Sequence, residues 1–372
     1  MIRRTQAGRI PVLGLVALLA IGCSSQAPTP SPEATRAPTA VPSATPVPTP
    51  TPTASPTEEP SPSAVGVSPL DGLPADPALA NRLPLAVMID DNVIARPQSG
   101  FNAASIVYQA PADGGEDRYM LVFQEMDAPD IGPVRSGRPY FVYWAAEYRS
   151  AFAHYGGDER TLTKVIPSIT NKLIYNLDAL SGSGSAFHRI SSRKAPHNAY
   201  TSTASLYATA NAKRYPTSMV GGLTNRLFAD DAPVADRPAE GSITIPYGRG
   251  ATGYTYVPAT NTYLRTVAGK PHIDPIDKKQ VVARNVVVLF MAYSIDPESE
   301  PGHARPVLAQ IGKGTAWVFR DGLIIKGTWK KADQGALTRF FDAAGNEITL
   351  VRGRTFIQVV ATGTKVTYVA KS

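Results

Sequence analysis

Two arginines that flank a Ser-Gly pair, in the segment Arg135-Ser136-Gly137-Arg138, are the residues of this chain best suited to bind an anion. Pro139 follows directly, and proline in the first turn is typical of a helix start. The segment therefore brings together two guanidinium groups, a hydroxyl and unpaired helix amides, which favour carboxylate or phosphate. The alternative is that both arginines pair with structural carboxylates such as Asp90 or Glu147.

Other polar side chains would join this anion site if the fold brings them to it. They lie in two further polar segments of the first half, at residues 114–118 and 193–198. The additional candidate ligand-binding residues are Arg118, Arg193, Lys194 and Asn198.

Asp90, His154 and His197 are the candidates for proton transfer. Asp90 closes the first expected strand, His154 closes an apparent strand at 151–154, and His197 lies in a basic loop. A His/Asp pair can act as general acid and base on a hydrolysable bond. For each histidine alone, a hydrogen-bonded structural role is the alternative. The histidine spacing lacks a His-Glu-x-x-His arrangement, so we predict neither a metal site nor a cofactor.

Strands and helices alternate in the first half. Short apolar runs bounded by Pro, Gly or Asp predict strands at 85–89, 105–108 and 119–123. Residues 138–152 have aromatics and alanines at helical spacing and predict a helix. A second helix is expected over 202–213, with Thr201 or Ser202 as its N-cap.

Beyond a polar stretch at 230–240 the pattern is almost purely β. Strands are expected at 242–247, 253–257, 281–293, 316–319, 323–325 and 355–361, with turns at Asp321-Gly322 and at 344–346. We therefore predict an α+β chain. An N-terminal mixed α/β domain, residues 67–235, is followed by a β-rich C-terminal domain, residues 236–372.

Residues 1–22 predict a lipoprotein signal peptide. They hold three arginines and then an apolar run at 10–20, about half the roughly 20 residues that span a bilayer as a helix. The ending Leu19-Ala20-Ile21-Gly22-Cys23 resembles a lipobox, in which small residues precede a cysteine that is acylated. Cys23 is the single cysteine of the chain, so it cannot form an intramolecular disulfide. We expect lipid on Cys23 to anchor the protein at the extracytoplasmic face of the cell membrane.

A linker of unusual composition follows the signal peptide. Pro, Thr and Ser supply 27 of the 41 residues from 24 to 64, and this segment holds 12 of the chain's 34 prolines. Such a composition cannot bury apolar surface, so a disordered, semi-rigid linker is expected over 23–66. At ~3.1 Å per residue its extended reach is on the order of 120 Å. Its Ser and Thr content permits O-glycosylation, which the sequence leaves open.

The net charge does not indicate nucleic-acid binding. The formal charge is +7, and three of the positive charges lie in the predicted signal peptide. The remaining basic residues are scattered among acids, which is typical of an ordinary solvated surface. No nucleic-acid partner is expected.

Several long motifs resemble those of the YerB-like bacterial lipoproteins, a two-domain family of unknown function. In the first half these are Pro-Leu-Asp-Gly-Leu at 69–73, Arg-Pro-Gln-Ser-Gly at 96–100, Ile-Gly-Pro-Val-Arg-Ser-Gly-Arg-Pro-Tyr at 131–140 and Arg-Lys-Ala-Pro-His-Asn at 193–198. In the second half they include Gly-Thr-Trp-Lys at 327–330 and Gly-Arg-Thr at 353–355. The resemblance covers nearly everything after the linker. It implies a lipoprotein with two domains, and it implies no reaction.

These features predict a lipid-anchored cell-envelope protein whose N-terminal domain binds an anionic ligand, either a cell-wall component or an envelope partner. A second possibility is an envelope hydrolase that combines His/Asp acid–base chemistry with an arginine-stabilised anion. A third is a structural scaffold of an envelope complex. Whether the chain is an enzyme stays open.

Overall fold

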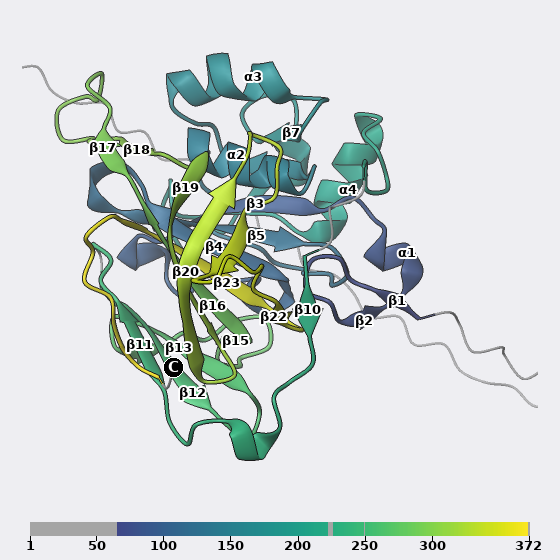
Figure 1. Cartoon of the computed structure of the whole chain (residues 1–372). Helices are drawn as coiled ribbons and strands as arrows, with labels where there is room; N and C mark the ends of the chain where they lie inside the picture. Colours follow the sequence, from purple (N-terminus) through teal and green to yellow (C-terminus); the bar gives the residue numbers. More distant parts are fainter. Residues whose placement is uncertain (1–64, 222–225, 249, 371–372) are drawn as a thin grey trace, which may run out of the picture. The chain divides into compact units, whose positions relative to one another are not determined.

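The computed structural model describes residues 65–221, 226–248 and 250–370 (Figure 1). The predicted signal peptide, the predicted lipidation site Cys23 and all but the last two residues of the predicted linker lie outside the described residues. Within the described ranges, no helix combines the length and the apolar character that crossing a membrane requires.

A mixed sheet of ten strands forms the centre of the fold (Figure 1). In spatial order its strands are β21 (Arg339–Asp342), β20 (Leu323–Lys331), β19 (Gly312–Arg320), β16 (Asn285–Met291), β23 (Thr355–Ala361), β4 (Ile106–Pro111), β5 (Asp117–Phe123), β3 (Leu85–Asp90), β6 (Ala151–His154) and β7 (Tyr175–Asp178). Strands β3, β5 and β16 are buried along their whole length, which explains why they are apolar except at their ends.

A smaller antiparallel sheet lies on one side of the large sheet, and two of the helices, α2 (Pro139–Glu147) and α3 (Ile166–Ile169), lie on the other (Figure 1). The small sheet has the order β14 (Lys270–Pro271), β13 (Thr262–Val267), β12 (Thr252–Val257), β11 (Ser242–Ile245) and β24 (Thr367–Val369), and β15 (Val282–Ala283) also pairs with β13. The helices are α1 (Pro77–Ala80), α2 (Pro139–Glu147), α3 (Ile166–Ile169) and α4 (Thr203–Ala212), with a π-helical turn at Thr161–Val165 before α3.

The remaining strands of the described residues form four two-stranded sheets. They are β1 (Gly66–Val67) with β2 (Pro74–Ala75), β8 (His188–Arg189) with β9 (Ala199–Tyr200), β10 (Phe228–Ala229) with β22 (Leu350–Val351), and β17 (Tyr293–Ile295) with β18 (Pro306–Leu308). Short 3-10 turns occur at Val93–Ala95, Phe101–Ala103, Asp113–Gly115, Gly184–Ala186 and Val234–Asp236.

The predicted α+β class, with a β-rich second half, is confirmed. Ser202 caps α4 as predicted, since its hydroxyl accepts a hydrogen bond from the Ser205 amide at 3.1 Å. The helix predicted over 138–152 is wrong at its end, because α2 stops at Glu147 and Arg149 has a φ of 50°. The run predicted as one strand at 281–293 is divided among three sheets as β15, β16 and β17.

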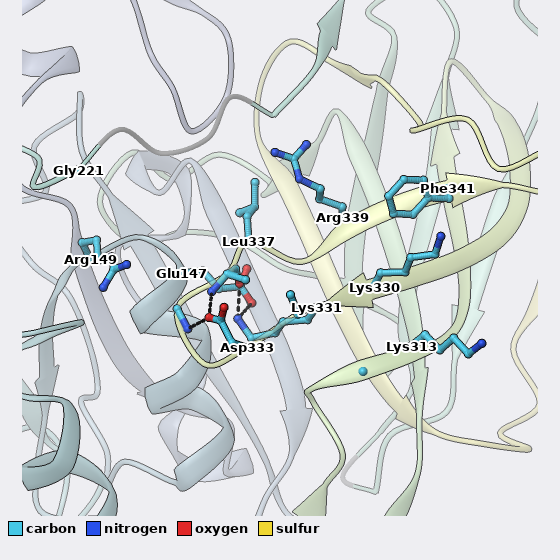
Figure 2. Close-up of a pocket in the computed structure, with 14 residues that line it drawn as sticks. Glu147, Arg149, Gly221, Lys313, Lys330, Lys331, Asp333, Leu337, Arg339 and Phe341 are labelled. Carbon is cyan, nitrogen blue, oxygen red and sulfur yellow. Dashed lines mark hydrogen bonds and ion pairs between the residues drawn. The ribbon is translucent and has the colours of Figure 1, made fainter.

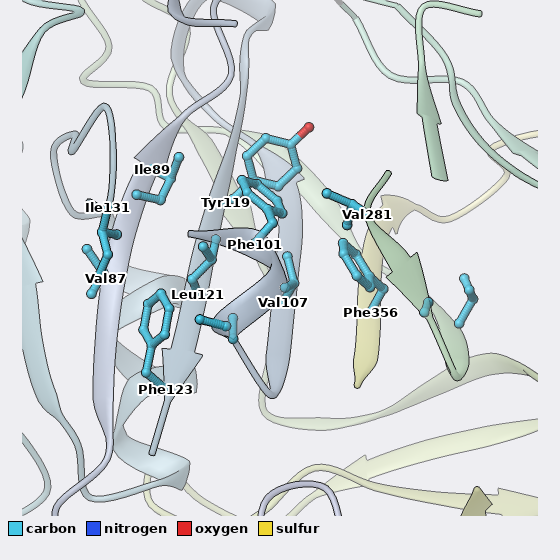
Figure 3. Packing of buried hydrophobic residues seen from close by; sticks show 14 of the residues in the cluster. Val87, Ile89, Phe101, Val107, Tyr119, Leu121, Phe123, Ile131, Val281 and Phe356 are labelled. Atoms are coloured by element: carbon cyan, nitrogen blue, oxygen red, sulfur yellow. The ribbon is translucent and has the colours of Figure 1, made fainter. Parts of the chain in front are cut away.

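Two hydrophobic cores fill the fold, one on each face of the large sheet. Figure 3 shows the core that faces the small sheet, where Phe101 packs between Tyr119 and Phe356 with ring centres 5.0 and 6.5 Å apart. On the opposite face Trp144 of α2 stacks on Tyr108 of β4 with ring centres 5.1 Å apart. The large sheet is therefore covered on both sides over its central strands.

The two halves of the chain share the large sheet. Strand β23, near the C-terminus, lies between β16 and β4 and runs parallel to both. The two halves therefore exchange backbone hydrogen bonds at the centre of the fold. The domain boundary at residues 235–236 stays a prediction.

A buried polar network also joins the halves. Arg265 of β13 is fully buried and donates hydrogen bonds to Gln109 Oε1 at 2.9 Å and to the Tyr119 hydroxyl at 3.0 Å. Gln109 in turn donates to Asp91 Oδ2 at 3.3 Å, and Asp91 forms an ion pair of 2.9 Å with Arg96. One carboxylate thus lies among two guanidinium groups inside the protein.

Candidate functional site

Five of the predicted site residues line one cavity of about 390 Å³: Arg118, Arg135, Ser136, Arg138 and His197. The first half adds Asn92, Asp113, Gly114 and Glu116, and the loop between β17 and β18 adds Gly302 and His303. The cavity is therefore built by segments that are up to about 200 residues apart in the sequence.

Strand ends and the entry to α2 position these side chains. Asp90 is the last residue of β3, and the strand register places it opposite Arg118 of β5. The segment before α2 runs beside β3, because the Arg135 amide donates to the Met88 carbonyl at 3.0 Å and the Asp90 amide donates to the Pro133 carbonyl at 2.9 Å. These backbone bonds fix Arg135 next to the end of β3.

Asp90 holds His197 at the cavity wall. The distance from Asp90 Oδ2 to His197 Nδ1 is 2.6 Å, and Asp90 itself is buried. Arg135 Nε lies 3.2 Å from the same carboxylate oxygen. No hydrogen bond from a described residue reaches His197 Nε2. When Nδ1 is protonated and donates to Asp90, Nε2 is available to accept a proton.

Arg138 and Arg118 differ in how their charges are compensated. Arg138 Nε donates to Asp113 Oδ1 at 2.7 Å, and a second bond joins the same two side chains. Arg118 is buried and donates to the Ser136 carbonyl at 2.9 Å, its Nε has no hydrogen bond, and no carboxylate among the described residues forms an ion pair with it. Burial, followed by repulsion from Arg138, lowers the pKa of Arg118 to about 10. The charge of Asp113 counteracts this lowering, but Arg118 is a buried cation that forms no ion pair with the described residues.

His154 does not line the cavity. It is fully buried in β6, where Nδ1 lies 2.7 Å from the Gly156 carbonyl and Nε2 lies 2.8 Å from Asn176 Oδ1. Both ring nitrogens lie within hydrogen-bond distance of these partners, so neither nitrogen is free for the predicted proton transfer by His154.

Arg193, Lys194 and Asn198 also lie outside the cavity lining. Arg193 donates to the carbonyls of Ala95 at 2.7 Å and Pro97 at 2.8 Å. Asn198 donates to the Arg193 carbonyl at 3.1 Å, and the Lys194 carbonyl accepts from the His197 amide at 3.0 Å. The hydrogen bonds of these residues stabilise the loop between β8 and β9, which carries His197. None of the three lines the cavity, where the predicted ligand-binding role would require it to lie.

The sequence interpretation missed Asp113 and His303. Asp113 follows β4 in a Gly-rich turn, and its role as the partner of Arg138 depends on where α2 packs. His303 lies in a turn about 100 residues further on than His197, and no local pattern connects the two. Within the described residues, no group of three or more metal-ligating side chains is close enough to hold a metal ion.

Comparisons with known proteins agree with this architecture. Residues 70–216 match the model for the N-terminal domain of "Protein of unknown function (DUF3048)", and residues 243–357 match the model for its C-terminal domain. The chain is 29% identical over 300 residues to the protein named "Putative lipoprotein YerB" of Bacillus subtilis (strain 168), covering 79% of this chain and 86% of that protein. The crystal structure of the YerB protein from Bacillus subtilis superposes with a TM-score of 0.71 at 26% identity, over 82% of this chain and 99% of that one. The chain therefore belongs to the DUF3048 family of proteins of unknown function, as its resemblance to YerB-like lipoproteins predicts.

Proposed function

We propose that this protein is a lipid-anchored envelope protein that binds an anionic group, phosphate or carboxylate, in the cavity lined by Arg118, Arg135 and His197. The observation that carries the proposal is the state of Arg118, which is buried, has an unpaired Nε and lacks an ion-pair partner among the described residues. A buried cation is stabilised strongly by an anion that accepts its hydrogen bonds. The arrangement thus favours a negatively charged ligand.

The other cavity residues suit the same ligand. Arg135 lines the cavity next to Arg118, and its Nε has no hydrogen bond of good geometry although Asp90 lies 3.2 Å away. Ser136 also lines the cavity. An oxyanion held between two guanidinium groups would gain charge-assisted hydrogen bonds, each worth about 1.5–3 kcal/mol.

The proposed location rests on the N-terminal sequence and on a relative. The lipobox-like ending at Cys23 predicts acylation, and the similar protein from Bacillus subtilis carries the name of a lipoprotein. Several acyl chains on one residue give stable membrane attachment. The ligand would then be a cell-wall component or another envelope molecule that carries phosphate or carboxylate.

A second candidate function is hydrolysis of a bond in the same ligand. The 2.6 Å contact between Asp90 and His197 favours it, because the carboxylate orients the ring and stabilises the imidazolium after proton uptake. His197 Nε2 would take a proton from the attacking water and give it to the leaving group as the bond to that group breaks. Arg118 and Arg135 would stabilise the negative charge that develops.

Titration of the full chain in neutral detergent with inorganic phosphate and with solubilised cell-wall fragments tests both candidates. Arg118→Gln is expected to weaken binding about tenfold or more, since it removes at least one charge-assisted bond. Arg214→Gln makes the same change at an exposed position and is expected to bind like the native chain. Thermal unfolding of each variant shows whether the fold is retained.

Two results would decide against the proposals. Equal affinities of the native chain and a folded Arg118→Gln variant would refute the anion site. For hydrolysis, the expected result is release of products by the native chain and none by His197→Ala, with ligand binding retained. Binding without any product release by the native chain would refute the hydrolase candidate and leave the binding function.

A further inference from the structure

A second cavity, of about 940 Å³, opens at the edge of the large sheet where β19, β20 and β21 lie side by side (Figure 2). Its lining has an excess of positive charge. The cationic side chains are Arg149, Lys313, Lys330, Lys331 and Arg339, against the anionic Glu147 and Asp333.

Part of this charge is compensated within the protein. Lys331 and Glu147 form a fully buried ion pair of 3.0 Å at the inner wall of the cavity. Asp333 accepts hydrogen bonds from the amides of Gly335 and Ala336, each at 2.8 Å. The remaining cations belong mainly to the three edge strands.

Three of these cations form a row across the strands. The register pairs Lys313 of β19 with Lys330 of β20, and Lys330 with Arg339 of β21. Directly paired side chains lie on the same face about 5 Å apart, and like charges in that position are destabilising. Arg339 has an ion pair, with Glu347 at 2.7 Å, whereas Lys313 and Lys330 form none with the described residues. An added polyanion would relieve this repulsion.

Hydroxyl and aromatic groups lie next to the cations on the same face. The neighbouring row consists of Thr315, Thr328 and Phe341, again paired in register. The Lys330 ammonium lies 4.2 Å from the centre of the Phe341 ring. Thr315, Thr328 and Lys330 are exposed, so the described residues leave this part of the sheet uncovered.

The face continues with a second aromatic group and a fourth cation. Trp317 of β19 pairs with Lys326 of β20, whose ammonium lies 5.2 Å from the centre of the Trp317 ring. Lys326 is exposed and Trp317 is half-buried. Because alternate residues of a strand are about 7 Å apart, the three rows extend over roughly 13 Å along the strands.

We propose that this face of β19, β20 and β21 binds a linear polyol phosphate, a polymer whose repeating unit carries one phosphate and several hydroxyl groups. The cation row matches a ligand with several closely spaced charges better than one with a single charge. The threonine hydroxyls suit ligand hydroxyls, and the aromatic rings suit the C–H faces of a polyol. This site is separate from the cavity that contains Arg118.

Fluorescence anisotropy with a labelled glycerol-phosphate oligomer of about eight repeats tests the proposal on the full chain in neutral detergent. The double variant Lys313→Gln/Lys330→Gln removes two charges at exposed positions and breaks no ion pair of the described residues. It is expected to weaken binding about tenfold and to reduce the salt dependence by about 0.7 per lost charge in a log–log plot. Phe341→Ala is expected to weaken binding severalfold at unchanged salt dependence.

Control variants and competing ligands make the outcome decisive. Lys278→Gln/Lys279→Gln removes the same charge from exposed positions elsewhere and is expected to leave binding unchanged. Equal binding by the native chain and the Lys313→Gln/Lys330→Gln variant would overturn the site. Binding of a single-stranded DNA octamer or of anionic lipid vesicles at least as tight as that of the oligomer would overturn the assigned ligand class.

Discussion

The buried network around Arg265 predicts how the stability of the protein depends on the position of the network's carboxylate. Asp91 is the carboxylate of this network, and Gln109 lies between it and Arg265. Burial raises the pKa of Asp91, whereas Arg96 and then Arg265 lower it. The substitution Asp91→Asn would leave both guanidinium groups without this partner. Loss of one member of a buried ion pair costs about 3–5 kcal/mol in the free energy of unfolding.

Moving the carboxylate to position 109 is expected to restore much of that loss. In Gln109→Glu alone, the new carboxylate would contact Arg265 over the present 2.9 Å but would lie about 3.3 Å from Asp91. With an effective dielectric constant of ~20, the attraction is about 6 kcal/mol and the repulsion about 5 kcal/mol, so they nearly cancel. Desolvation of the added carboxylate then makes the single variant less stable than the native chain.

The double variant Asp91→Asn/Gln109→Glu removes the repulsion and keeps one carboxylate beside Arg265. The repulsion of about 5 kcal/mol is an upper limit, and coupling energies between contacting residues reach about 3 kcal/mol, so we expect the double variant to be about 2–3 kcal/mol more stable than the sum of the two single changes predicts. Urea unfolding of the full chain, followed by circular dichroism at neutral pH, gives the four free energies of the cycle. A double variant no more stable than the sum of the two single changes would refute the reasoning.

Two further predictions concern buried ionisable groups. Burial, and then the charge of Glu125, raise the pKa of Asp71 to about 7, so the native state retains a proton that the unfolded chain releases above about pH 4. The free energy of unfolding then falls as the pH rises from about 4 to about 7, and Asp71→Asn is expected to reduce this fall. If the difference between the free energies of unfolding at about pH 5 and about pH 8 is the same in the native chain and in Asp71→Asn, the prediction is wrong. Glu147→Gln breaks the fully buried pair with Lys331 but can still accept the hydrogen bonds from Thr338, and it is expected to cost about 3–5 kcal/mol, as thermal and urea unfolding can show.

Local patterns predicted the strands well because the central strands are buried on both faces. The predicted strand at 355–361 coincides with β23, and the apolar runs at 85–89 and 119–123 lie within β3 and β5. Strand β4, which pairs with β23, lies about 250 residues earlier in the sequence. Neither apolar run indicates that the two strands pair. The strand expected at 151–154 coincides with β6, whereas the end of α2 was missed because Arg149 turns the chain with a φ of 50°.

The part of the candidate site that the sequence predicts consists of charged residues that lie at the ends of expected strands or beside an expected helix start. Arg135 and His197 meet at Asp90, which the sequence places at the end of a strand. Arg193 was expected as a ligand because it is basic and near His197, but its guanidinium satisfies backbone carbonyls of another loop. A local sequence pattern does not show which distant backbone carbonyls need a hydrogen-bond donor. The carbonyl partners of Arg193 are therefore evident only from the folded structure.

The position of β23 has a consequence for how the chain folds. This strand lies at the centre of the large sheet, yet it begins at Thr355, about 250 residues after its neighbour β4. Until it has been synthesised, β4 and β16 each lack the neighbour that separates them, and the central sheet cannot close. Contacts between strands so far apart in sequence form slowly, because a long loop must be closed first. Closure of the large sheet is therefore a late step in folding, because it waits for a strand that is synthesised long after β4.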